Sequence, residues 1–176
     1  MKSYKFSPIE NEEQLLEAIK YTHFQCFSLC KNNFGRYLPV AGNIGIFCHY
    51  DDEYEFLTKL KKELTEESDN WNHKYYRLRK PIIISAYGDI TTTTYTYLYI
   101  RKPEDQRHEV GDVDFVLNNK EYLDLKNSLL GGKKIRGVEI LDRLDLDLIK
   151  LSDPDIDTIS FIGTEYMSGN MKIQTE

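Results

Sequence analysis

Two aspartates separated by a single residue, Asp112 and Asp114, have the type and spacing that metal chemistry requires. They alternate with apolar side chains in the run 111–117, so a strand there would point both carboxylates toward the same face. Two carboxylates on one face can share a divalent cation such as Mg²⁺ or Mn²⁺. One hypothesis is therefore a small metal-dependent enzyme that acts on phosphoesters.

The residues around these aspartates support that hypothesis only in part. Gly-Asp-Val-Asp at 111–114 is similar to the metal-binding strands of nucleotidyl-transfer enzymes, but the histidine expected after such a strand and the Gly-Ser expected before it are missing. His49, which precedes Asp51, Asp52 and Glu53, is the candidate for proton transfer. The alternative is that Asp51 or Asp52 caps a helix and His49 ends a strand.

A second set of polar residues follows a period of two in two predicted strands. In the runs 74–80 and 93–101, leucine and isoleucine alternate with arginine and tyrosine. If the two strands are neighbours in one sheet, the polar set shares a face directed away from the helices. This set consists of Arg77, Arg79, Tyr95, Tyr97, Tyr99 and Arg101. Arginine binds phosphate oxygens and tyrosine rings stack on bases, although cross-strand pairs of these residues also stabilise sheets without any ligand.

This polar face makes a binding or regulatory module the leading hypothesis. Its ligand would be a phosphate-bearing small molecule such as a nucleotide, a short single-stranded nucleic acid, or a protein partner, because tyrosine and arginine dominate many protein interfaces. Trp71, His73 and Lys74 would extend the basic patch. The module needs no cofactor and no metal ion, whereas the enzyme hypothesis requires Mg²⁺ or Mn²⁺. The sequence does not decide whether the protein is catalytic.

Composition limits the partners and the location. The 176-residue chain has a formal net charge of −6, which argues against sequence-independent DNA binding. Its longest purely apolar run is three isoleucines, and its N-terminus lacks an apolar signal segment, so we expect a cytoplasmic protein without a membrane span. Cys26, Cys30 and Cys48 predict no disulfide framework, and the first two lie on the apolar face of a helix. Oligomeric state and ligand identity stay open.

The elements that would position these residues predict an α+β fold in one domain, 1–176, with a frayed tail at 167–176. Helices are predicted at 10–31, from Asp52 to a fraying end at 65–68, and at 119–130. Strands are predicted at 36–49, 74–86, 93–101, 111–117, 133–141 and 158–163, and 142–151 fits either a strand or a helix, with a preference for strand. This order predicts a mainly antiparallel sheet backed by helices, on a ferredoxin-like β-α-β-β-α-β plan with extra strands and an N-terminal helix.

Overall fold

The computed structural model of the protein describes residues 4–67, 75–143 and 146–167. In these ranges the chain forms the helices α1 (Glu12–Phe34), α2 (Asp51–Leu64) and α3 (Asn119–Leu130). The strands are β1 (Val40–Phe47), β2 (Tyr76–Ile84), β3 (Thr93–Arg101), β4 (Gly111–Leu117), β5 (Val138–Arg143), β6 (Leu146–Asp153) and β7 (Ile156–Thr164). The stretch 142–151, which the sequence left open, contributes to the antiparallel pair β5 and β6.

The described strands belong to one sheet in the order β2-β3-β1-β4-β7-β6-β5. β1 is parallel to β3 and β4 is parallel to β7, while the other neighbours are antiparallel, so the sheet is mixed. The predicted ferredoxin-like plan with a mainly antiparallel sheet is therefore wrong. That plan starts with a β-α-β unit whose helix joins two parallel strands. Here α2 joins β1 to β2, and these strands run in opposite directions because β3 is parallel to β1 and antiparallel to β2.

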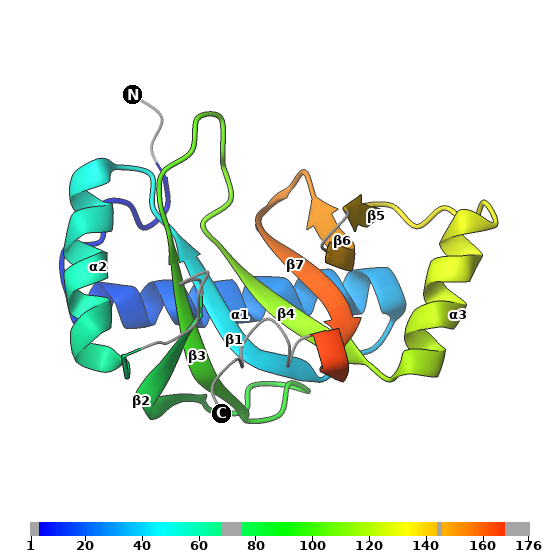
Figure 1. The fold of residues 1–176 in the computed structure, drawn as a ribbon, viewed down its shortest axis with the longest axis horizontal. Coiled ribbons are helices and arrows are strands. Elements are labelled where there is room, and N and C mark those ends of the chain that lie inside the picture. The colour runs from blue at the N-terminus through cyan, green and yellow to red at the C-terminus, as the bar shows by residue number, and fades with distance from the viewer. Residues whose placement is uncertain (1–3, 68–74, 144–145, 168–176) are drawn as a thin grey trace.

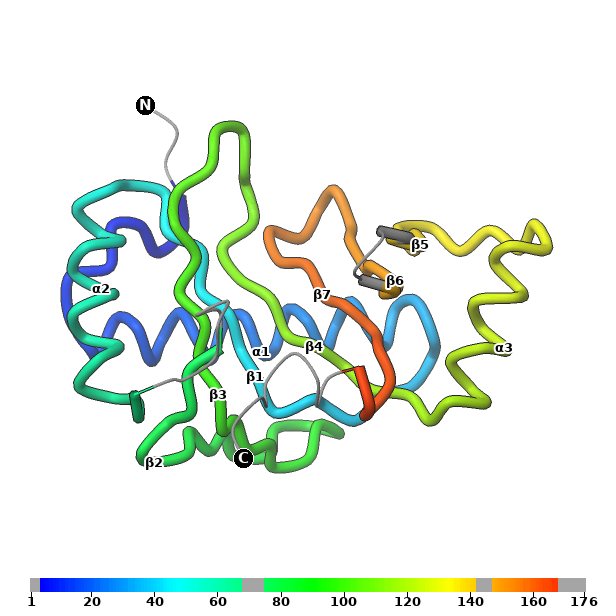
Figure 2. The backbone as a smooth tube through the Cα atoms, in the orientation of Figure 1, coloured from blue at the N-terminus to red at the C-terminus, as the bar shows by residue number. Residues whose placement is uncertain are grey.

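Helix α1 crosses one face of the sheet and packs on β7, β4 and β1 (Figure 1). It begins where the side chain of Asn11 accepts a hydrogen bond from the backbone N–H of Gln14. It ends at Gly35, whose φ of 67° suits glycine and whose N–H donates to the carbonyl of Lys31. Helices α2 and α3 lie at opposite ends of the sheet (Figures 1 and 2). The face of β4 and β7 opposite α1 is thus left without cover from these three helices.

The hydrophobic core lies between α1 and the sheet. Cys26 and Cys30 of α1 are fully buried in one cluster with Ile19, Val113 and Ile162. This burial confirms the prediction that both cysteines face the core. Strand β4 is buried along its whole length, on both of its faces. Its polar residues on the face away from α1 must therefore be enclosed by other parts of the chain.

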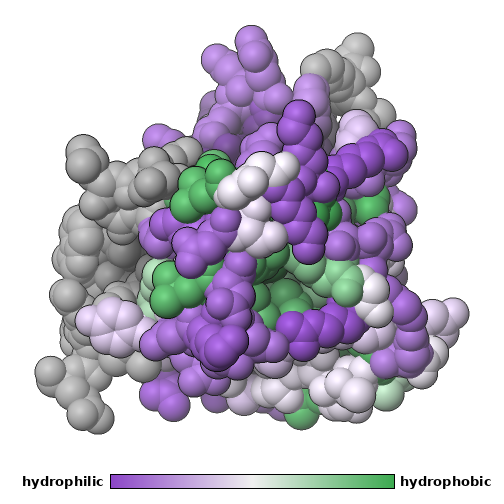
Figure 3. Space-filling model, turned by 90° about the vertical axis from the view of Figure 1, so that its right-hand side faces the viewer, coloured by the Kyte–Doolittle hydropathy of each residue, from purple (hydrophilic) through white to green (hydrophobic). Residues whose placement is uncertain are grey.

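The end of the molecule that carries α3 exposes apolar side chains. Leu123 and Leu130 are 53% and 66% exposed. Seen from this side, apolar residues gather around a hollow that polar residues surround (Figure 3). Helix α3 is held to the sheet through Asp147 of β6, which accepts hydrogen bonds from Tyr122 and Lys126. Within the described ranges, no helix is both long enough and apolar enough to cross a membrane.

Candidate functional site

Asp112 and Asp114 lie on the face of β4 opposite α1, so their shared orientation agrees with the sequence pattern. A Cβ on Gly111 would lie 2.8 Å from the hydroxyl of Thr22 on α1, so positions 111 and 113 face that helix. The two aspartates therefore face away from it, yet they are only 3% and 6% exposed. A buried carboxylate is costly unless hydrogen-bond donors or cations compensate it. The surroundings of this pair decide what it can bind.

The neighbouring strand β1 makes room for Asp112 by placing a glycine beside it. Gly45 pairs with Asp112 on one side and with Tyr99 of β3 on the other. A Cβ at position 45 would collide with the carboxylate of Asp112 and lie 3.3 Å from the ring of Tyr99. Any other residue at this position would displace one of these two side chains. Gly45 is thus part of the site, because its missing side chain is the space that the carboxylate occupies.

Asp114 is held by two neutral donors. Its Oδ2 accepts a hydrogen bond from Nδ2 of Asn43 at 2.7 Å and from the hydroxyl of Tyr75 at 3.2 Å. Its other oxygen, Oδ1, is buried and accepts no hydrogen bond from any residue that the structure describes. Burial, followed by the charges of Asp114 and Asp112, raises the pKa of Tyr75 well above its ordinary value. Tyr75 therefore stays protonated and serves as a donor to the carboxylate.

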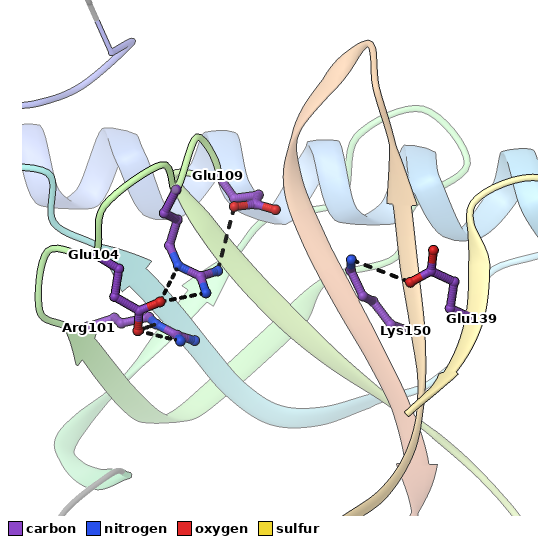
Figure 4. Close-up of polar contacts among 6 residues, drawn as sticks. Arg101, Glu104, Glu109, Glu139 and Lys150 are labelled. Atoms are coloured by element: carbon purple, nitrogen blue, oxygen red, sulfur yellow. Dashed lines mark hydrogen bonds and ion pairs between the residues drawn. The ribbon is translucent and has the colours of Figure 1, made fainter. Parts of the chain in front are cut away.

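The end of β3 and the loop that follows it contribute a network of paired charged side chains. Both oxygens of Glu104 are used, one by the guanidinium of Arg101 and the other by that of Arg107 (Figure 4). Each guanidinium also lies 5.3 Å from the centre of the Phe47 ring. Arg107 approaches Glu109 at 3.5 Å as well. Burial opposes ionisation of Glu104, but the bonds from Arg107 and Arg101 prevail and lower its pKa.

These parts surround a cavity of about 430 Å³, named here the sheet cavity. Its floor includes Asp112, Asp114 and Tyr75, and one side is the Arg101–Glu109 segment. The other side is an apolar wall from β5, β6 and β7, formed by Leu141, Leu148, Ile159 and Phe161. Lys150 also lines this side, 3.7 Å from Glu139 on the adjacent strand (Figure 4). The cavity therefore has carboxylates at its floor, a paired charged network at one side, and apolar side chains together with the paired Lys150 at the other.

Part of the predicted tyrosine and arginine face lies at or near this cavity. Arg101 lines it directly. Tyr97 and Tyr99 alternate with the buried Leu98, so they lie on the face that carries Asp112. Arg77 pairs with Tyr97 across β2 and β3 and is exposed. These residues share one face, as the alternation in the sequence predicted.

Tyr95 and Arg79 lie elsewhere, which corrects the predicted common face. Tyr95 is fully buried, and its hydroxyl lies 2.8 Å from Nδ1 of His23 on α1. Arg79 lines a different cavity, between β2 and the helices α1 and α2. The cause is a shift in the register of β2 against β3 between Arg77 and Ile82. Such a bulge interrupts the alternation on which the prediction depended.

His49, the candidate for proton transfer, is not among the residues that line the sheet cavity. Its Nδ1 lies 2.9 Å from the hydroxyl of Ser7, and its ring stacks on Tyr4 with ring centres 3.6 Å apart. Its backbone N–H donates to Glu53. Burial is the main cause that lowers the pKa of His49. The structure therefore separates His49 from the aspartate pair with which the sequence hypothesis combined it.

Several residues that shape the site were missed at the level of sequence. Asn43 and Gly45 left a signal, because they flank Ile44 and so make one face of a buried strand polar. Glu104 lies in a loop, where no periodicity identifies a role. Trp71, His73 and Lys74, which were predicted to extend the basic patch, lie outside the described residues.

Comparison with known proteins finds a solved structure with a similar fold but does not assign the chain to a family. No protein-family model and no curated protein matches the chain. A solved structure described as "Structural Genomics, Protein EC4020" has a TM-score of 0.62 and 14% sequence identity, over 98% of this chain and 99% of that chain. At this identity the similarity extends to the fold alone.

Two further solved structures overlap less well. One is a glyoxalase/bleomycin resistance protein/dioxygenase superfamily member from Vibrio splendidus, with a TM-score of 0.33 and 7% identity over 68% of this chain and 93% of that chain. The other is a methylmalonyl-CoA epimerase from Streptomyces coelicolor, with a TM-score of 0.31 and 15% identity over 72% and 98%. TM-scores this low carry no conclusion about the fold or ligand of the present chain.

Proposed function

We propose that the protein binds a small amphipathic organic molecule in the sheet cavity. The observation that carries the proposal is the cavity itself, about 430 Å³ in volume, in which apolar side chains of β5, β6 and β7 line the same space as a larger set of charged and polar side chains. Ligand sites are usually concave, of about 300–1,000 Å³, and combine apolar surface with a small number of placed polar groups. The apolar part of the ligand would lie against Leu148 and Phe161, and its polar group beside Asp114.

A phosphate group matches this cavity less well than the sequence suggested. The arginines that line it, Arg101 and Arg107, already share the two oxygens of Glu104. A phosphate at the floor would face the carboxylates of Asp112 and Asp114, and like charges repel strongly where water is scarce. The proposed ligand is therefore a small molecule without a phosphate group.

Metal-dependent hydrolysis is not part of the proposal. In the described ranges, no three histidine, cysteine, aspartate or glutamate side chains are grouped so as to hold a metal ion. Two carboxylates supply only part of the oxygen shell that Mg²⁺ requires. Mg²⁺ and Mn²⁺ enter the binding test as added components, so that a metal requirement would be detected.

The proposal is tested by methyl NMR with three probes that share a six-carbon chain: hexylamine, 1-hexanol and hexanoate. At least one probe should shift the methyl signals of Leu148 and Ile159 saturably, without Mg²⁺ or Mn²⁺. Replacing Leu141 with Trp fills the apolar side of the cavity and should abolish the effect. The matched variant Leu130→Trp changes a leucine that is 66% exposed on α3, and binding should persist. Shifts that survive in Leu141→Trp, or their absence with all three probes, would contradict the proposal.

A further inference from the structure

We infer that the ligand of the sheet cavity carries a cationic nitrogen, such as an ammonium or amidinium group, that lies beside Asp114. The inference rests on the proposed function and specifies the chemistry of that ligand. It depends on three observations: the pairing of the cations in the cavity, the partners of Asp114, and the apolar wall opposite.

The cations that line the cavity are already paired with carboxylates. Arg101 and Arg107 bind opposite oxygens of Glu104 and pack on the ring of Phe47, which fixes them at one side. Lys150 lies 3.7 Å from Glu139. Figure 4 shows these two ionic groups on opposite sides of β4 and β7. Among the described residues, neither group forms an ion pair with Asp114.

Asp114 is buried, and its hydrogen-bond donors among the described residues are neutral. Asn43 and Tyr75 both donate to the same oxygen, Oδ2. The carboxylate lines the cavity, is 6% exposed, and has a second oxygen that accepts no hydrogen bond from the described residues. A buried carboxylate gains most from a charge-assisted bond to a cation. The described residues supply no such cation, and the inference assigns this place to a cationic donor of the ligand.

The apolar side chains of the cavity indicate the chemistry of the ligand beyond its cationic nitrogen. Leu141, Leu148, Ile159 and Phe161 line the cavity from β5, β6 and β7, and Phe161 pairs with Asp114 across β4 and β7. A hydrated inorganic cation would leave this surface in contact with water. An organic cation covers it with its carbon atoms while its nitrogen reaches the carboxylate, so both parts of the cavity are used. The ligand class is thus an alkyl or aryl amine, or an amidine with an apolar substituent.

The matched probes of the preceding section also test this inference. At pH 7 and low salt, hexylammonium should bind more tightly than 1-hexanol, and hexanoate most weakly. In Asp114→Asn, hexylammonium should lose about 10- to 100-fold in affinity, as expected for one charge-assisted hydrogen bond, while 1-hexanol should change about two-fold or less. The control Asp124→Asn removes the same charge from α3, outside the cavity, and should leave both affinities unchanged.

The outcomes separate the inference from the proposed function. Equal binding of the amine and the alcohol would overturn the cationic ligand and leave the cavity as a binding site. Absence of binding by all three probes would contradict both. Tighter binding of hexanoate would overturn the inference in favour of an anion held by Lys150. If Asp114→Asn fails to fold, the order of the three probes on the unaltered protein still decides between these outcomes.

Discussion

Among single residues, the buried imidazole of His23 couples stability to pH. It lies on α1, fully buried beside Tyr95 of β3, and burial lowers its pKa from 6.5 to about 4. Between these two values the unfolded chain binds a proton that the folded chain does not. Stability due to His23 is therefore fully present above pH 6.5 and is lost as the pH falls toward 4, by at most about 1.4 kcal/mol per pH unit.

Replacing His23 with Gln should reduce this dependence on pH. The free energy of unfolding, measured with urea at pH 7 and pH 4.5, should fall less in His23→Gln than in the unaltered protein. The matched variant His108→Gln changes an exposed histidine and should keep the full difference. Equal differences in all three proteins would show that His23 does not titrate with a lowered pKa.

Among the elements, the loop between β3 and β4 is held together by the carboxylate of Glu104. Glu104 ties together two arginines that come from the end of β3 and from the loop itself, and Arg107 also donates its backbone N–H to the carbonyl of Glu104. A local segment held by a few side-chain bonds opens separately from the rest of the fold. The stability of this side of the sheet cavity therefore depends on Glu104.

Glu104→Gln should loosen the loop without unfolding the protein. Losing charge from a partly exposed network costs about 1 kcal/mol, so backbone amides at 105–109 should exchange hydrogen about five-fold faster. Asp124→Asn breaks the exposed pair with Lys120 on α3 and should leave these amides unchanged. Unaltered exchange in Glu104→Gln would mean that the backbone alone holds the loop.

The sequence predicted each element better than the relations between elements. Alternation along β4 placed Asp112 and Asp114 on one face because that strand is regular. The same reasoning failed for Tyr95, because a register shift in the β2–β3 pair is not visible as a change in alternation. Asn43 reaches Asp114 only because β1 lies beside β4, and no local pattern encodes which strands become neighbours.

On the scale of the whole molecule, the hydrophobic core of the described residues lies mainly between α1 and the sheet, and substitutions there should cost the most stability. Ile162 in β7 is fully buried in this core, whereas Ile83 in β2 is 63% exposed. Ile162→Ala should therefore lower the free energy of unfolding by about 2–5 kcal/mol, and Ile83→Ala by about 0.5 kcal/mol or less. Denaturation with urea measures both. A comparable loss in the two variants would contradict the described packing.

The position of β7 has a consequence for how the chain is made. β7 is the last of the described strands, yet it lies between β4 and β6 and is the neighbour that connects β2-β3-β1-β4 to β6-β5. While a ribosome is still adding the residues before Ile156, the two groups of strands have no shared hydrogen-bonded border, and the edges of β4 and β6 are open. Unpaired edges of this kind promote aggregation. The nascent chain is therefore exposed to this risk until β7 emerges and joins the two groups of strands.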